Sequence, residues 1–170
     1  MSLASVHRCL DQSENLAAIQ VDELLGEIIA QLGMLMGERP DDPLISTDID
    51  PVVLTPDEAV PVALLTTEAV TNALKYARPR APGQRSTIRV SFKQAGDVVD
   101  LVVANSINPD APDAGQEQGV SGLGSQMMNA FAAQLGAQLE KVIEDGVFSV
   151  RLRMRPTRDE SAPTGRQAGQ

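Results

Sequence analysis

Apolar side chains recur along the chain at two different spacings, and polar stretches separate them. Recurrence every three or four residues predicts helices, and short apolar or alternating runs predict strands. The expected helices span residues 3–16, 21–37, 56–77 and 125–135, and the expected strands span residues 44–49, 52–54, 87–92, 98–104, 138–143 and 147–154. Because turn residues join the last four strands into two hairpins, the pattern predicts an α+β fold, a two-layer sandwich of helices on a sheet.

Local signals define two of these helices more closely. Thr55, Pro56 and Glu58 form a helix start, in which Thr55 caps, Pro56 stands in the first turn and Glu58 completes a capping box. The last helix carries four large apolar side chains that we expect to pack against the sheet: Met127, Met128, Phe131 and Leu135.

The composition narrows the possible chemistry. Among 170 residues there are 14 Lys and Arg against 23 Asp and Glu, a net charge of −9, with one His, one Cys and no Trp. Phosphate backbones are bound by basic surfaces, so we expect no nucleic acid partner. One His and one Cys cannot build a His/Cys zinc site or a disulfide framework. No stretch resembles a membrane span or a signal peptide, so we expect a cytoplasmic protein without direct membrane contact.

Glu68, Asn72 and Lys75 lie on one face of the predicted helix over residues 56–77, because they are four and three residues apart. A carboxamide oxygen is a hard ligand for Mg²⁺, a carboxylate can hold a water molecule, and an ammonium can meet phosphate charge. This face therefore predicts a phosphate and magnesium site. The same spacing also fits an amphipathic helix with Glu68 and Lys75 on its solvated side.

Glycine recurs between Gly119 and Ser125, directly before the last helix. Glycines leave backbone N–H groups exposed and a helix N-terminus attracts phosphate, so the segment is a candidate phosphate-binding loop. A flexible connector has the same composition. The segment lacks the Gly-Lys-Ser/Thr of a P-loop, and no βαβ unit surrounds it, so it is not a dinucleotide fingerprint either.

The order of these motifs resembles the ATP-binding domain of sensor histidine kinases. The motif Glu68-x-x-x-Asn72-Ala73-x-Lys75-Tyr76-Ala77 resembles the N box of that family, and Gly122-Leu123-Gly124 resembles its G2 box. The family has the Bergerat fold, shared with the gyrase, heat-shock-90 and MutL-type ATPases. The resemblance implies a mixed, mostly antiparallel sheet with helices on one face, preceded by one or more N-terminal helices. The ending Gln134-Leu135-Gly136 and the first helix resemble kinases of the second dimerisation class.

The resemblance also implies roles for individual residues. Asn72 would ligate Mg²⁺, and Glu68 would polarise the nucleophile or a metal-bound water. Asn105 would stand at the adenine. Arg78 and Arg80 follow closely and would add positive charge near the phosphates. The remaining implied nucleotide-binding residues are Lys75, Tyr76, Gly119, Gly122, Leu123, Gly124 and Ser125. The implied cofactors are ATP and Mg²⁺.

Two features depart from the family pattern. Asn105 replaces the family's adenine-reading Asp, and Ile107 stands where a glycine is usual. The single imidazole, His7, suits an exposed helical position better than the role of phosphoacceptor. We therefore expect the acceptor histidine to precede residue 1. Residues 1–37 would be the end of a dimerisation helix region plus a linking helix, residues 38–156 the ATP-binding domain, and residues 157–170 a disordered tail.

The leading hypothesis is a histidine protein kinase domain that binds Mg-ATP and transfers the γ-phosphoryl group to a histidine in two-component signal transduction. Its expected partners are the phosphoacceptor histidine of a dimerisation domain and a response regulator, with a homodimer in the full-length protein. One alternative is a degenerate, non-catalytic domain acting as a histidine phosphotransferase or docking module, which Asn105 favours. Another is an anti-sigma-factor serine kinase, which the lack of an acceptor histidine favours.

Overall fold

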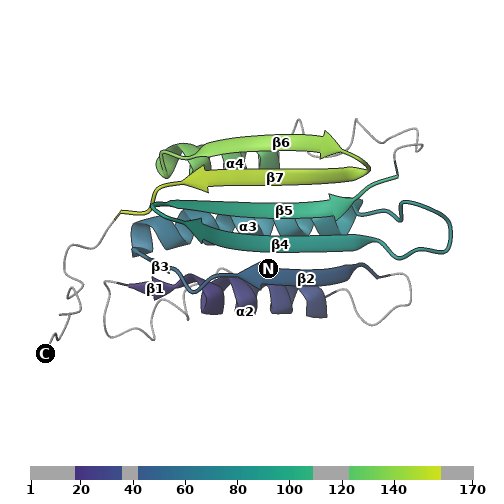
Figure 1. Ribbon diagram of the computed structural model, residues 1–170, viewed down its shortest axis with the longest axis horizontal. Helices are drawn as coiled ribbons and strands as arrows, with labels where there is room; N and C mark the ends of the chain where they lie inside the picture. Colours follow the sequence, from purple (N-terminus) through teal and green to yellow (C-terminus); the bar gives the residue numbers. More distant parts are fainter. Residues whose placement is uncertain (1–17, 36–41, 109–122, 158–170) are drawn as a thin grey trace, which may run out of the picture.

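The computed structural model describes residues 18–35, 42–108 and 123–157 (Figure 1). The predicted helix over residues 3–16 falls outside these ranges, as does the tail predicted over residues 157–170 except for its first residue, Thr157. The helices are α2 (Val21–Met34), α3 (Pro56–Tyr76) and α4 (Leu123–Gln134). The strands are β1 (Ile19–Gln20), β2 (Leu44–Ile49), β3 (Val53–Leu54), β4 (Thr87–Ala95), β5 (Val98–Ser106), β6 (Gln138–Glu144) and β7 (Val147–Met154). Within the described ranges, no helix is long and apolar enough to cross a membrane.

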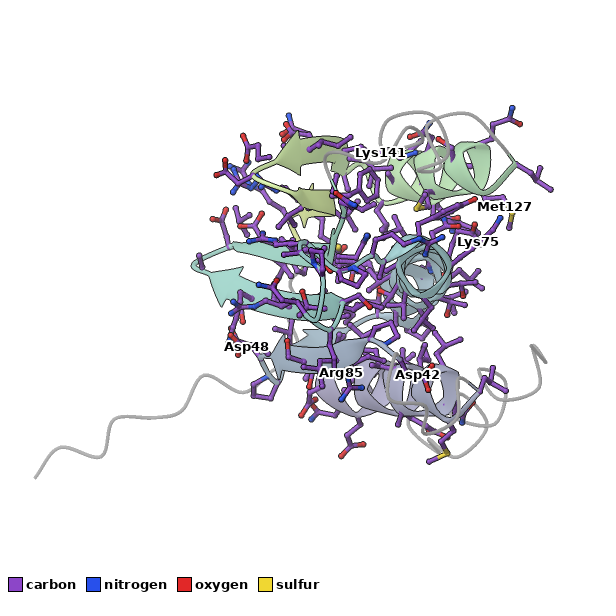
Figure 2. All side chains as sticks on the ribbon, turned by 90° about the vertical axis from the view of Figure 1, so that its right-hand side faces the viewer. Asp42, Asp48, Lys75, Arg85, Met127 and Lys141 are labelled. Atoms are coloured by element: carbon purple, nitrogen blue, oxygen red, sulfur yellow. The ribbon has the colours of Figure 1, made fainter. Side chains whose placement is uncertain are left out.

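The main sheet has five strands in the order β2-β4-β5-β7-β6. β2 runs parallel to β4, because the chain crosses from one to the other through α3, and the other neighbours pair antiparallel. A short antiparallel pair joins β1 to β3. All three helices cover one face of the sheet, with α3 between α2 and α4 (Figures 1 and 2). The predicted α+β sandwich, with a mixed and mostly antiparallel sheet, is confirmed.

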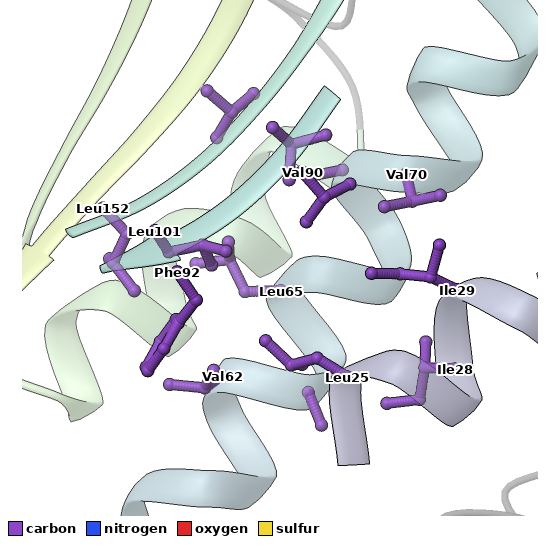
Figure 3. Close-up of a cluster of buried hydrophobic side chains, with 14 of the residues drawn as sticks. Leu25, Ile28, Ile29, Val62, Leu65, Val70, Val90, Phe92, Leu101 and Leu152 are labelled. Atoms are coloured by element: carbon purple, nitrogen blue, oxygen red, sulfur yellow. The ribbon is translucent and has the colours of Figure 1, made fainter. Parts of the chain in front are cut away.

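Alternation along the central strands determines which face the helices cover. Alternate apolar residues of β4 and β5 are exposed by 2% or less: Ile88, Val90, Phe92, Val99, Leu101 and Val103. Figure 3 shows part of this layer meeting Val62 and Leu65 of α3 and Leu25 of α2. α3 packs against the sheet and against both neighbouring helices.

A buried carboxylate joins the start of α3 to the end of the described chain. The predicted capping box is present, and Glu58 accepts hydrogen bonds from the Thr55 N–H at 3.2 Å and the Thr55 hydroxyl at 2.9 Å. It also accepts from the N–H and hydroxyl of Thr157 at 2.6 and 2.8 Å. Burial alone would raise the pKa of the Glu58 carboxyl, but these hydrogen bonds outweigh it and lower the pKa.

One packing expectation on α4 is wrong. Met128 is 1% exposed, and Phe131 and Leu135 pack partly buried against the core, but Met127 is 42% exposed. Successive residues of a helix point about 100° apart. Only one of two adjacent methionines can therefore face the sheet squarely, and on α4 it is Met128.

Candidate functional site

α3 and α4 bring the two sequence motifs into contact. The Glu68 carboxylate accepts a hydrogen bond from Asn72 Nδ2 at 3.2 Å, one turn further along α3. The same carboxylate lies against Gly124 at the start of α4. An ideal Cβ on Gly124 would lie 2.0 Å from Glu68 Oε1 and 2.9 Å from Glu68 Cδ. A side chain at position 124 would therefore displace the carboxylate.

The direction of the Asn72 amide follows from this hydrogen bond. Because its Nδ2 donates to Glu68, its Oδ1 points away from that carboxylate. A carboxylate and a carboxamide oxygen are hard donors, which Mg²⁺ accepts together with phosphate oxygens and waters. The described part of the chain has no group of three or more His, Cys, Asp or Glu side chains that could hold a metal ion. The pair itself supplies two kinds of hard oxygen donor from one helix face.

Lys75 continues the polar row toward solvent. Glu68 and Asn72 are half-buried, whereas Lys75 is exposed. Its Nζ lies 4.7 Å from the centroid of the Tyr76 ring, a cation–π contact that holds the ammonium near the end of α3. Figure 2 shows Lys75 on α3 on the same side of the molecule as Met127 of α4. Lys75 therefore places an exposed positive charge at the C-terminal end of the row formed by Glu68 and Asn72.

Arg78 and Arg80 make local contacts instead of the expected phosphate cluster. The Arg78 guanidinium donates to the carbonyl oxygens of Lys75 at 3.1 Å and Ala77 at 2.9 Å. Carbonyl groups at a helix C-terminus attract cations, which explains this position. Arg80 lies at the β6–β7 turn, where a Cβ on Gly146 would be 3.7 Å from its Nε. Sequence proximity to Lys75 therefore misplaced both arginines.

Residues in the first turn of α4 differ in how far they are exposed to solvent. Leu123 is 74% exposed, whereas Ser125 is 9% exposed. The Ser125 hydroxyl accepts a hydrogen bond from Lys141 Nζ of β6 at 2.5 Å. Burial lowers the pKa of the Lys141 ammonium. No sequence signal links these two residues, because the pair arises from strand β6 lying beneath α4.

Asn105 lies under the helix layer. It is 3% exposed and stands on the same side of β5 as Leu101 and Val103. Its Nδ2 donates to the Ser106 carbonyl oxygen at 3.3 Å. An uncharged carboxamide costs less to bury than a carboxylate, so the Asp-to-Asn departure agrees with this environment.

The residues after Asn105 have structural roles that the sequence did not indicate. The Ser106 hydroxyl accepts from the Thr87 N–H at 2.9 Å and donates to the Arg78 carbonyl at 2.8 Å. Ile107 is 2% exposed, and its N–H donates to the Gly146 carbonyl at 2.9 Å. The chain here joins three loops at one end of the sheet, so Ile107 is a core residue. Gly119, Gly122 and His7 lie outside the described residues.

A hollow of about 480 Å³ lies on the opposite, helix-free face of the sheet. Its charged side chains are largely paired: Arg153 donates to both carboxylate oxygens of Asp100 at 2.7 and 3.1 Å. Arg151 lies 3.5 Å from Glu144. A hollow whose charges already neutralise one another is a weaker candidate for an anionic ligand than the row on α3. The other residues lining it are Val102, Gln138 and Glu140.

Comparison with known proteins bears on the fold. No protein-family model matches the chain, and no curated protein matches it. The histidine kinase domain of the Erythrobacter litoralis EL346 blue-light activated histidine kinase matches with a TM-score of 0.73 and 18% identity, over 89% of this chain and 70% of that one. The nucleotide-free catalytic domain of histidine kinase ThkA matches with a TM-score of 0.65 and 14% identity, over 84% of this chain and 97% of that one.

The cytoplasmic segment of histidine kinase QseC gives a third match, with a TM-score of 0.57 and 17% identity over 91% of this chain and 89% of that one. At such identities the matches show the fold alone. This fold is the one that catalytic domains of histidine kinases have. The chain spans 44% of the longer structure of the EL346 kinase.

Proposed function

We propose that this chain is the ATP-binding catalytic domain of a sensor histidine kinase. It binds Mg-ATP and transfers the γ-phosphoryl group to a histidine on a dimerisation segment, from which a response regulator receives it. The observation that carries the proposal is the contact of Glu68, Asn72 and Gly124 across α3 and α4. The full-length protein would act as a cytoplasmic homodimer, and its dimerisation helices would be of the second class.

In this proposal the side chains act by position and charge, which is how phosphoryl transfer is mostly catalysed. Mg²⁺ held at this site would supply positive charge that offsets part of the phosphate charge. Asn72 would hold the ion through Oδ1, the atom directed away from Glu68. Glu68 would orient and polarise the attacking group. Lys75, beside Tyr76, would meet phosphate charge at the exposed end of the row.

The start of α4 would receive the phosphates. Backbone N–H groups of the first helical turn have no partner within the helix and point toward an approaching anion. Gly124 lets the helix begin next to Glu68 without a side chain between them. Gly119, Gly122, Leu123 and Ser125 would complete this part of the site. Asn105 would meet adenine as a neutral hydrogen-bonding group.

Asn105 also supports a second candidate, a non-catalytic domain that docks or accepts phosphoryl groups without using ATP. Its amide is buried and its Nδ2 is already bound to the Ser106 carbonyl. An adenine amino group is a donor, so it would have to reach the acceptor Oδ1 of Asn105, a residue that is only 3% exposed. If burial keeps adenine from Oδ1, the fold would be retained while nucleotide binding is lost.

Calorimetric titration with magnesium and a non-hydrolysable ATP analogue separates these candidates. The proposal predicts saturable, magnesium-dependent binding by the native protein and none by Asn72→Ala. Asn129→Ala, on the exposed side of α4, is the matched control and should bind as the native protein does. If the native protein and Asn72→Ala both fail to bind at millimolar analogue, the kinase proposal is wrong and the docking candidate gains.

If ATP binds, the acceptor distinguishes a histidine kinase from an anti-sigma-factor serine kinase. Labelled ATP is incubated with histidine-bearing and serine-bearing candidate segments. Phosphohistidine is lost in acid and survives in base, whereas phosphoserine survives in acid. Acid-labile label on the partner supports the histidine kinase, and acid-stable label supports the serine kinase.

A further inference from the structure

Strand β6 sends one lysine toward the helices. Lys141 is half-buried, and its Nζ donates a hydrogen bond to Ser125 Oγ at 2.5 Å. Ser125 is itself 9% exposed, so water has little access to the serine. Figure 2 shows Lys141 beside α4, on the side of the helix layer that is nearest the sheet edge. The contact joins an edge strand to the first turn of α4.

Two effects oppose a charged ammonium at position 141. The N-terminal end of a helix carries partial positive charge, and a cation in the first turn is unfavourable. Burial also disfavours the ammonium and lowers the pKa of Lys141. Leu139, two residues earlier on the same side of β6, is apolar and packs against the core. A charged residue at position 141 therefore needs a local interaction to offset its cost, and the hydrogen bond to Ser125 provides one.

The hydrogen bond lies one residue away from the glycine that contacts Glu68. Ser125 follows Gly124, whose missing side chain leaves room for the Glu68 carboxylate. Glu68 in turn accepts a hydrogen bond from Asn72. Lys141 is thus the outermost member of a continuous series of contacts that ends at the candidate nucleotide site. Movement of the first turn of α4 would change the distance between Gly124 and Glu68.

We propose that Lys141 is a positioning residue for nucleotide binding: through Ser125 it fixes the first turn of α4, and with it Gly124, against Glu68 and Asn72. The proposal rests on the proposed ATP-binding function for its effect on affinity. It assigns Lys141 no contact with the nucleotide. The proposed effect passes through the hydrogen bond to Ser125, and this coupling is testable.

A double-mutant cycle tests that requirement. Lys141→Met and Ser125→Ala are compared singly and together by titration with magnesium and a non-hydrolysable ATP analogue. Lys141→Met removes the charged donor of the hydrogen bond, and Ser125→Ala removes its acceptor. Each single variant should therefore bind the ATP analogue about fivefold to tenfold more weakly than the native protein. The double variant should bind no more weakly than Lys141→Met alone, since the lysine substitution already removes the hydrogen bond to Ser125. Lys141→Arg, which keeps a donor of similar reach, should restore most of the affinity.

The matched control is Lys93→Met on the opposite face of the sheet, where Lys93 pairs with Asp48 and Asp50. It should leave the affinity unchanged. Multiplying effects in the double variant would overturn the proposal, because Lys141 would then act independently of Ser125. Equal binding by the native protein and Lys141→Met would also overturn it.

Hydrogen exchange gives a readout that needs no nucleotide. Lys141→Met and Ser125→Ala should raise the exchange rate of backbone amides in the N-terminal part of α4, that of Met127 among them, several-fold over the native rate. Lys141→Arg and Lys93→Met should not. If the native protein binds no nucleotide but exchange rises as expected, the proposed function fails while the positioning role stands. If exchange is unchanged in both variants, the positioning role is wrong whether or not ATP binds.

Discussion

Replacing Gly124 with alanine perturbs the contact between the two motifs with a single added methyl group. The new Cβ would lie 2.0 Å from Glu68 Oε1, 2.9 Å from Glu68 Cδ and 3.5 Å from Glu68 Cγ. The first two distances are too short for any real contact, so the Glu68 side chain must rotate away. Its carboxylate would then leave Asn72 Nδ2, at present 3.2 Å distant.

The cost to folding should be small. A half-exposed hydrogen bond with one charged partner contributes about 1 kcal/mol or somewhat more. Alanine in a helix returns about 0.5–1 kcal/mol relative to glycine. The two effects nearly cancel, and the group that moves is the end of a flexible side chain. We therefore expect the free energy of unfolding to change by less than about 1 kcal/mol.

The cost to nucleotide binding should be large, because Glu68 and Asn72 lose their arrangement at once. We expect Gly124→Ala to weaken Mg-ATP binding by at least about tenfold, which corresponds to 1.4 kcal/mol. The assay pairs a urea unfolding curve with calorimetric titration. Gly26→Ala is the control: its Cβ would meet nothing within 4 Å in α2, so stability should rise slightly and affinity should stay the same. Native affinity in Gly124→Ala would refute the role assigned to this contact.

Three further changes test other parts of the account. Glu58 has a lowered pKa, so its contribution to stability is complete above the ordinary glutamate pKa and is lost as the pH falls through the lowered pKa. Glu58→Gln should therefore lower the free energy of unfolding by about 1–3 kcal/mol at pH 7 and flatten the decline of stability below pH 5. Urea unfolding measured across this pH range tests both effects. Asn105→Asp should tighten ATP binding about threefold to tenfold if the carboxamide meets adenine, and an unchanged affinity in calorimetry would show that it does not. Asn72→Asp should place two carboxylates at hydrogen-bond distance and raise the pKa of one of them, so the affinity for Mg-ATP should fall as the pH drops toward 5. An affinity that does not change with pH would contradict this.

The elements that local sequence defines were predictable. The start of α3 depends on Thr55, Pro56 and Glu58, which act within four residues of one another. The β4–β5 and β6–β7 hairpins depend on turns between adjacent strands. The parallel pairing of β2 with β4 and the small β1–β3 sheet depend on contacts between distant segments. Such pairings are fixed by packing rather than by residue preference, so the strand pattern alone could not specify them.

At the candidate site too, contacts within one helix were predictable from the sequence, whereas contacts between elements were not. The row of Glu68 and Asn72 follows from helical spacing, so it could be predicted from the chain alone. The contact of Glu68 with Gly124 joins two helices and required the structure. Arg78 could have faced either phosphates or carbonyl groups, and its place at the end of α3 decides for the carbonyls. Lys141 lies far from Ser125 in sequence, and no pattern connects them.

Backbone amide NMR during titration with magnesium and a non-hydrolysable ATP analogue tests the central claim most directly, because it locates the ligand. The account predicts saturable shifts at Asn72, Gly124 and Asn105, which disappear when magnesium is removed with a chelator or Asn72 is replaced by alanine. Asp100 and Arg153, on the opposite face of the sheet, should not shift. Shifts confined to that opposite face, or no shifts at millimolar analogue, would contradict the claim that α3 and α4 form an ATP-binding site.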